Sequence, residues 1–150
     1  MIEIDQSHKI ERTSKDTVLA MSNLERSLVI PARVKREVLA ILKRRGKRRN
    51  IVCCQLFAVG VFILLRPHLR TVIEQREQIM IDVEYTAHED KIKGMILRCM
   101  YRDGYFLPKE RIFFAHVGKS SRAHRIAWHV QRGIIDADSV VTLEEVLQWL

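Results

Sequence analysis

The chain has few cysteines, and they follow no pattern that suits a metal site. Its three cysteines, Cys53, Cys54 and Cys99, are an odd number and lie in apolar segments without the spacing of metal ligands. Disulfide frameworks belong to oxidising compartments, so we expect reduced core thiols in a cytoplasmic protein. The same spacing argues against a zinc centre.

The chain also lacks an apolar run long enough to cross a bilayer. Residues 51–65, IVCCQLFAVGVFILL, are nearly all apolar, but the run is short and contains Gln55 and Gly60. A spanning helix needs about 20 apolar residues. We therefore expect a buried central helix over 52–66, with a short or interfacial membrane segment as the alternative.

No signal peptide or linker is expected either. The first twenty residues contain no apolar stretch and carry four acids, Glu3, Asp5, Glu11 and Asp16. No internal repeat or low-complexity tract divides the 150 residues, of which 47% are apolar and 29% charged. This composition predicts a single globular domain over 1–150, located in the cytoplasm.

Acidic residues are in deficit, with 18 Asp and Glu against 26 Lys and Arg, for a formal charge of +8. Such an excess of positive charge favours polyanionic partners, either nucleic acid or anionic lipid. We expect DNA or RNA as the partner and no small-molecule cofactor. A homodimer through residues 51–66 is a further expectation, because an all-apolar helix needs cover on every side.

Apolar periodicity predicts alternating strands and helices. Strands are expected near 2–7, 17–22, 27–30, 79–85 and 111–117, and DADSVV, residues 136–141, is expected to contain a further short apolar strand. Helices are expected near 32–45, 52–66 and 88–102, from Ser120 or Ser121 to Gly133, and after Thr142, which forms a capping box with Glu145. Because a helix separates strands 79–85 and 111–117, the two should be parallel if they share a sheet.

Three acids accompany this order of elements: Asp5 in IEIDQS, Glu37 in VKREVL and Asp82 in IMIDVEY. The combination resembles the ribonuclease H-like fold, which implies a three-layer α/β domain with a mixed five-stranded sheet. The resemblance also implies that Asp5, Glu37 and Asp82 hold two divalent cations, Mg²⁺ or Mn²⁺, for phosphodiester hydrolysis. Gln6 stands where many members have glycine, which favours a divergent, resolvase-like or transposase-like member, or one without catalysis.

The residues themselves leave the role of each acid open. An acid within an apolar strand is costly unless it is paired, hydrogen-bonded or bound to a cation. Asp82 therefore either binds a metal, pairs with Lys91, Lys93 or an arginine, or caps a neighbouring helix. Glu37 lies about 60° from Val34 on the helix, at the rim of the apolar stripe, so it could face the sheet.

A fourth ligand would come from the segment after the last long strand. The candidates there are His124, His129, Asp136 and Asp138, and we prefer His124 because it lies in the first turn of its helix. A solvated basic face is the alternative for both histidines. Glu84, His88, Glu89 and Asp90 form another cluster, which we interpret as the ordinary preference for acids at a helix start.

Two basic surfaces are expected. Lys119, Arg122, Arg125, His129 and Arg132 form a cationic stripe opposite apolar positions of the helix near 122–132, which suits a phosphate backbone. The segment KRRGKRR, residues 43–49, is a second concentration, and plain solvation is the alternative for both. Trp128 and Trp149 are expected to pack within the protein rather than stack on bases.

These patterns favour a nucleic-acid-binding protein that hydrolyses phosphodiester bonds with a divalent metal. The alternatives are a non-catalytic nucleic-acid-binding or assembly protein on the same fold, and a basic membrane-associated protein that uses residues 51–65.

Overall fold

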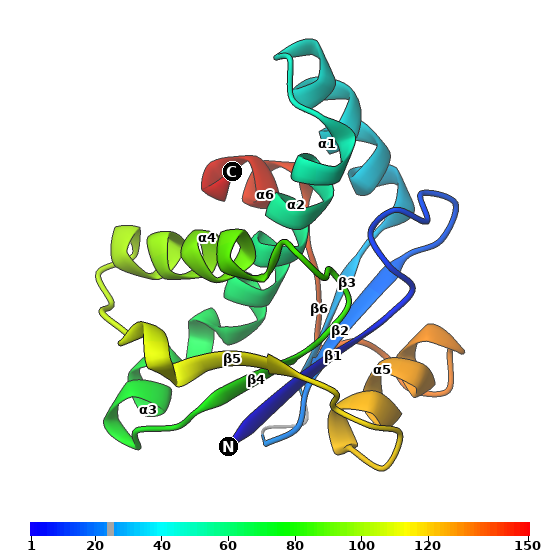
Figure 1. The fold of residues 1–150 in the computed structure, drawn as a ribbon. Coiled ribbons are helices and arrows are strands. Elements are labelled where there is room, and N and C mark those ends of the chain that lie inside the picture. The colour runs from blue at the N-terminus through cyan, green and yellow to red at the C-terminus, as the bar shows by residue number, and fades with distance from the viewer. Residues whose placement is uncertain (24–25) are drawn as a thin grey trace.

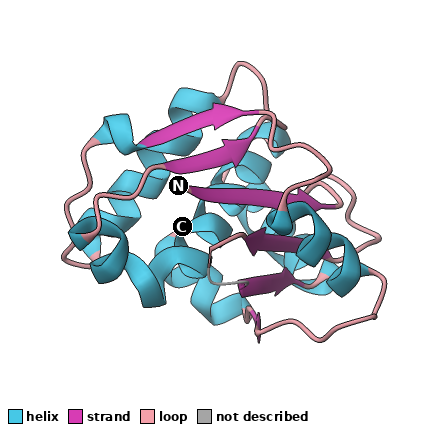
Figure 2. Cartoon of the chain, turned by 90° about the horizontal axis from the view of Figure 1, so that it is seen from below, coloured by secondary structure: helices cyan, strands magenta, loops and turns pink. Residues whose placement is uncertain are grey.

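The computed structural model describes residues 1–23 and 26–150 and has one mixed sheet with helices on both faces (Figures 1 and 2). The sheet has six strands in the order β5-β4-β1-β2-β3-β6. Their bounds are β1 (Ile2–Ser7), β2 (Thr17–Met21), β3 (Arg26–Ile30), β4 (Ile79–Asp82), β5 (Ile112–Ala115) and β6 (Ser139–Val140). The α/β class and the mixed sheet are as predicted, although the strand count is six rather than five.

The pairing directions divide the sheet into two parts. β1, β2 and β3 form an antiparallel meander, whereas β4 lies between β1 and β5 and runs parallel to both. The prediction of parallel strands joined through a helix is therefore confirmed. Strands β4 and β5 are shorter than predicted, because the chain leaves the ladder at Asp82 and Ala115.

The sixth strand lies in the segment 136–141, where a short strand was predicted, but its place in the sheet was not predicted. β6 is only two residues long and pairs in parallel with β3. Asp138, just before it, accepts hydrogen bonds from the backbone N–H of Ser27 at 2.8 Å and from its hydroxyl at 3.4 Å. A side-chain contact with a distant strand therefore guides this segment to the edge, which local periodicity could not indicate.

The helices form a layer on each side of the sheet. Helix α5 (Arg122–Gln131) packs on one face, where Ala127 meets Val18 and Ala20 of β2. The larger core on the other face is built with α1 (Ala32–Arg44), α2 (Arg49–Leu65), α3 (Leu69–Glu74), α4 (Glu89–Arg102) and α6 (Leu143–Trp149). Figure 1 shows α5 set apart from these helices across the sheet.

Helix α2 is the central helix of the larger core, as predicted. Twelve of its 17 residues are buried, and a methyl group added at Gly60 would lie 2.7 Å from the Leu19 Cδ1 and 2.8 Å from the Ile30 Cδ1. By length and composition, residues 49–74 could cross a membrane, but 67% of the most apolar window in this segment is buried inside the protein. The chain thus buries most of this apolar window itself, and the dimer through residues 51–66 stays a prediction.

The helix ends follow their sequence signals. α1 begins after Pro31, and Gly46 follows its end in the left-handed region with φ of 82°. Pro67 ends α2 in a short 3₁₀ turn, Arg66–His68. Thr142 and Glu145 form the predicted capping box at the start of α6.

Candidate metal centre

Two acids meet where β1 and β4 run side by side. Ile4 pairs with Ile81 across these parallel strands, and both are buried in the larger core. Since side chains alternate along a strand, the next residues, Asp5 and Asp82, point to the opposite face, where α5 lies. The pleat of two neighbouring strands therefore places both carboxylates on the same side.

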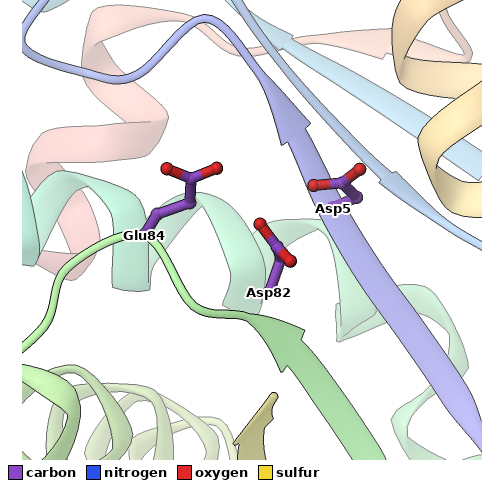
Figure 3. Close-up of side chains that lie close together, drawn as sticks. All are labelled: Asp5, Asp82 and Glu84. Carbon is purple, nitrogen blue, oxygen red and sulfur yellow. The ribbon is translucent and has the colours of Figure 1, made fainter. Parts of the chain in front are cut away.

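A third carboxylate joins them from the loop after β4. Asp5, Asp82 and Glu84 each offer an oxygen, and these three oxygens lie within 4.8 Å of one another. Figure 3 shows the three side chains reaching toward a common space from β1, the end of β4 and the following loop. We call Asp5, Asp82 and Glu84 the acidic cluster. Mg²⁺ and Mn²⁺ prefer oxygen ligands, and carboxylates supply them.

Backbone groups orient the two aspartates of the cluster. The backbone N–H of Val117 donates to the Asp82 Oδ1 at 2.9 Å, and the backbone N–H of Gln6 donates to the Asp5 Oδ1 at 2.8 Å. Asp82 makes this bond at the end of β4, and within the described residues it forms no ion pair with Lys91 or Lys93. Backbone donors thus hold two of the three carboxylates of the cluster in place.

His124 lies beside the cluster, in the first turn of α5. Its Nδ1 is 2.8 Å from the Asp5 Oδ2. An ionised carboxylate only accepts hydrogen bonds, so a proton on Nδ1 completes this hydrogen bond. A histidine that donates one ring N–H to a carboxylate and presents the other nitrogen is a common arrangement near bound metals.

The surroundings of the cluster disfavour the ionised form of two of its carboxylates. Burial raises the pKa of Asp5, and the nearby Asp82 charge adds to this rise, while hydrogen bonds from His124 and Gln6 oppose it. Burial also raises the pKa of Glu84, Lys9 opposes that rise, and a hydrogen bond with Asp82 adds to it. A bound cation would relieve both effects, since it favours the ionised carboxylates.

One cation of the chain itself reaches the cluster. The Lys9 Nζ lies 3.2 Å from the Glu84 Oε2 and 3.4 Å from the Glu84 carbonyl oxygen. Lys9 belongs to the loop 8–16 between β1 and β2. No sequence pattern indicated this contact, because it joins residues 75 positions apart.

Buried contacts hold the loop 8–16 in place. Lys35 of α1 is fully buried, and its Nζ donates to the Arg12 carbonyl at 2.8 Å, the Thr17 Oγ1 at 2.9 Å and the Lys9 carbonyl at 3.4 Å. The Tyr85 hydroxyl accepts from the Ile10 N–H at 3.2 Å. The position of Lys9 beside Glu84 is therefore fixed by the core.

Glu37 does not join the acidic cluster, contrary to the expectation that it could face the sheet. It lies on the outer side of α1, where its Oε1 is 3.7 Å from the Arg33 Nε and its side chain is 44% exposed. The helix instead turns Lys35 inward, because the carbonyl groups of loop 8–16 need a buried donor. The third carboxylate is Glu84, two residues after Asp82.

The place of Glu84 in the cluster agrees with its spacing from Asp82 in the sequence. In IDVEY, Asp82 and Glu84 have the spacing of two that places side chains on one face of an extended chain. The acids after it behave as expected, since Glu89 and Asp90 begin α4. His88 and Asp90 line a separate hollow beside α2 and α4.

The other fourth-ligand candidates take different places. His129 lies farther along α5 than His124, next to the Trp128 ring. Asp138 bonds Ser27 at the sheet edge, and Asp136 precedes it in the same segment. Of the four candidates, His124 alone contacts the acidic cluster among the described residues.

Helix α5 turns the predicted cationic stripe outward. Its buried residues are Ala123 and Ala127, and the stripe consists of Lys119, Arg122, Arg125, His129 and Arg132, all of which are exposed except the half-buried His129. Trp149 is buried as expected, but Trp128 is 42% exposed, and the Arg132 guanidinium lies 4.5 Å from its ring centre. The stripe therefore begins next to His124 and carries an exposed aromatic ring.

Comparisons of the chain with protein-family models, with curated proteins and with solved structures gave no match.

Proposed function

We propose that the chain is a nucleic-acid-binding protein with a ribonuclease H-like fold, and that it hydrolyses phosphodiester bonds with Mg²⁺ or Mn²⁺. The observation that carries this proposal is the convergence of Asp5, Asp82 and Glu84 within 4.8 Å, beside His124 and at the foot of a cationic helix. A site of this kind combines metal ligands with a surface for the substrate backbone.

The arrangement of elements supports the ribonuclease H-like assignment. The chain has a three-strand meander, helices, and then strands that alternate with helices on a mixed sheet. The first acid lies on the first strand and the second at the end of the fourth, as the resemblance implies. Glu84 stands in for the helical glutamate, which is a departure from the family pattern.

The residues of the cluster would have distinct roles. A divalent cation, when bound, supplies a water of lowered pKa and positive charge at the leaving oxygen. Asp5, Asp82 and Glu84 would hold it, and the Val117 N–H keeps the Asp82 carboxylate aimed at the site. His124 orients Asp5 and presents Nε2, which can accept or donate a proton at the substrate.

Substrate binding would fall to the stripe on α5. Arg122 and Arg125 are exposed in the first turn of the helix that carries His124, and Lys119 is exposed just before it. Phosphate contacts from these side chains would place a backbone phosphate next to the acidic cluster. Such contacts position the strand without reading its sequence.

The test is to replace Asp82 with asparagine, which keeps the shape but loses the charge that holds a cation. We expect Asp82→Asn to lower metal-dependent cleavage by at least about 100-fold, the upper end of what loss of an outer-shell partner costs. Binding to the same nucleic acid in EDTA should change little. Cleavage and binding are measured on branched, hybrid and single-stranded substrates with Mg²⁺ and with Mn²⁺.

The matched control is the double change Arg122→Gln and Arg125→Gln. It should do the reverse and weaken binding. It should also lower the salt slope, which is the steepness with which the logarithm of the binding constant falls with the logarithm of the salt concentration, by roughly one for each phosphate that the variant no longer binds. If the natural protein cleaves none of these substrates with either metal, the proposal that it is an enzyme is refuted. Binding without cleavage would favour the non-catalytic alternative, in which Lys9 already neutralises part of the cluster.

A further inference from the structure

We propose that the turn between α1 and α2 is a second binding surface for the phosphate backbone of a nucleic acid. We define this α1–α2 turn as residues 43–49, which contain six cations and no acid: Lys43, Arg44, Arg45, Lys47, Arg48 and Arg49. The inference rests on the proposed function for its ligand class, but it concerns a surface distinct from the α5 stripe.

The positive charge of the α1–α2 turn is not compensated locally. All six cations are exposed, and in residues 1–23 and 26–150 neither Lys43, Lys47 nor Arg48 makes an ion pair or a side-chain hydrogen bond. Helix α2 starts at Arg49, and in the described chain its first turn has no acid and no side-chain cap. The N-terminal end of a helix is itself partly positive, so cations there repel it.

Such a conflict with local preference is typical of functional surfaces. Lys43 and Arg44 lie at the C-terminal end of α1, where the helix dipole stabilises cations. Lys47, Arg48 and Arg49 lie at the N-terminal end of α2, where the dipole stabilises acids instead. A bound polyanion would relieve the repulsion among all of them. The free chain therefore presents a surface that is more favourable when an anionic partner covers it.

A groove between the two helices gives this surface its shape. The groove has a volume of about 460 Å³ and is lined by the apolar Leu39, Ala40 and Val52 and by the cations Lys43, Lys47, Arg48 and Arg49. None of its lining residues is acidic. A lining that combines apolar side chains with several cations fits a sugar–phosphate strand, which has uncharged sugars and anionic phosphates.

The distribution of exposed apolar side chains favours nucleic acid over a lipid surface. The large apolar side chains that are exposed in the described chain belong to other elements: Met1, Tyr101, Phe106, Trp128, Ile134, Ile135 and Val140. The α1–α2 turn, all of which is described, thus has no exposed wedge to insert among lipid tails. A membrane-binding surface combines cations with such apolar anchors.

Contacts link the α1–α2 turn to the acidic cluster. The Arg49 guanidinium donates to the Glu11 carbonyl at 2.9 Å, and the same loop 8–16 brings Lys9 to Glu84. Figure 1 draws the turn at the opposite end of the molecule from α5. A nucleic acid bound along α5, the acidic cluster and loop 8–16 would thus also reach the α1–α2 turn. The part of it that binds there would be distant from the phosphate that is cleaved.

The experiment compares three full-length proteins, each with its fold checked by circular dichroism. The turn variant carries Lys43→Gln, Lys47→Gln and Arg48→Gln, and it keeps Arg49 because that side chain holds loop 8–16. The control variant removes the same charge from exposed positions elsewhere, with Arg70→Gln, Lys91→Gln and Lys109→Gln. Binding to fluorescein-labelled short and long duplexes is measured in EDTA over a range of salt.

We expect the turn variant to bind the long duplex more weakly by about tenfold or more. Its salt slope should fall by up to about three, because each phosphate that is no longer neutralised lowers the slope by about 0.9. The control should bind like the natural protein. The short duplex, which cannot span from α5 to the turn, should distinguish the variants less.

The remaining outcomes separate the two proposals. If the natural protein binds no nucleic acid, the proposed function fails and this inference fails with it. If it binds but the turn variant and the control are equal, the inference alone is overturned. The last measurement uses vesicles of phosphatidylserine and phosphatidylcholine. If the natural protein binds these vesicles more strongly than duplex, and the turn variant does not bind them, the partner of the turn is a lipid surface and not a nucleic acid.

Discussion

At the scale of single residues, Lys9 gives the acidic cluster a cation of its own. The ammonium lies 3.2 Å from the Oε2 of Glu84, one of the three acids of the cluster. Two cations that share one carboxylate repel each other, so Lys9 should weaken metal binding while it keeps the metal-free cluster stable. The same side chain would thus limit how many divalent ions the cluster holds.

We therefore predict that Lys9→Gln binds Mn²⁺ more tightly, by roughly three- to tenfold, because a competing charge a few ångströms away is removed. Calorimetric titration with Mn²⁺ measures the change. Lys15→Gln, an exposed lysine of the same loop, is the control and should leave the affinity unchanged. Weaker binding by Lys9→Gln would mean that Lys9 chiefly positions Glu84.

Lys35 is the second residue whose charge is unusual. Its side chain is fully buried against carbonyl groups of loop 8–16, and burial lowers its pKa from 10.5 to about 8. Lys35→Met should lower the free energy of unfolding by about 1–3 kcal/mol, because it leaves buried carbonyl groups without a donor. Urea unfolding at neutral pH measures this loss.

The pH dependence of that loss has a definite sign. The unfolded chain keeps the Lys35 proton up to pH 10.5, whereas the folded protein releases it near pH 8. Between these values the unfolded state binds more protons, so the natural protein gains stability as the pH rises. Its advantage over Lys35→Met should widen from pH 8 to pH 10.5, and a constant difference would contradict the assignment.

At the scale of elements, the two helical glycines are predicted to behave oppositely. A methyl group at Gly60 of α2 would meet buried side chains of β2 and β3 at 2.7 and 2.8 Å, whereas Gly94 of α4 faces open space. Gly94→Ala should stabilise by about 0.5–1 kcal/mol through helix propensity. Gly60→Ala should destabilise by about 1–2 kcal/mol, since crowding exceeds that gain.

Thermal unfolding of the two variants side by side tests this packing. The helix-propensity term is common to both, so their difference isolates the contact between α2 and the sheet. Equal stabilisation by both changes would mean that α2 lies farther from β2 and β3 than the 2.7 and 2.8 Å approaches require.

Elements were more predictable from the sequence than the contacts between them. The strands near 2–7, 17–22 and 27–30 and the helix near 32–45 follow from period and capping alone. Asp5 and Asp82 were also predictable, because an acid inside an apolar strand demands a partner. The position of Glu37 outside the cluster was not predictable. Helical periodicity defines the apolar stripe of the helix, but it does not show that the carbonyl groups of loop 8–16 bond a buried Lys35.

At the scale of the whole molecule, the charge is distributed in two opposite ways. The chain has a net charge of +8, yet three carboxylates gather where β1 and β4 meet α5. The Lys and Arg side chains of the α5 stripe and of the α1–α2 turn are exposed, while the acids of the cluster are at least partly buried. A polyanion and a divalent cation would thus bind to complementary parts of one surface.

This distribution predicts that metal stabilises the fold. A ligand held at 100 times its dissociation constant adds about 2.7 kcal/mol, which for a chain of this size raises the melting temperature by about 5–10 °C. We expect such a rise for the natural protein in Mg²⁺ or Mn²⁺ and little or none for Asp82→Asn. In EDTA the order should reverse, with Asp82→Asn melting higher, because the amide removes the repulsion among Asp5, Asp82 and Glu84. Differential scanning fluorimetry of both proteins in EDTA and in each metal, at constant ionic strength, gives all the values. An equal rise in both proteins would mean that the metal acts elsewhere, and the acidic cluster would then lose its role as a metal centre.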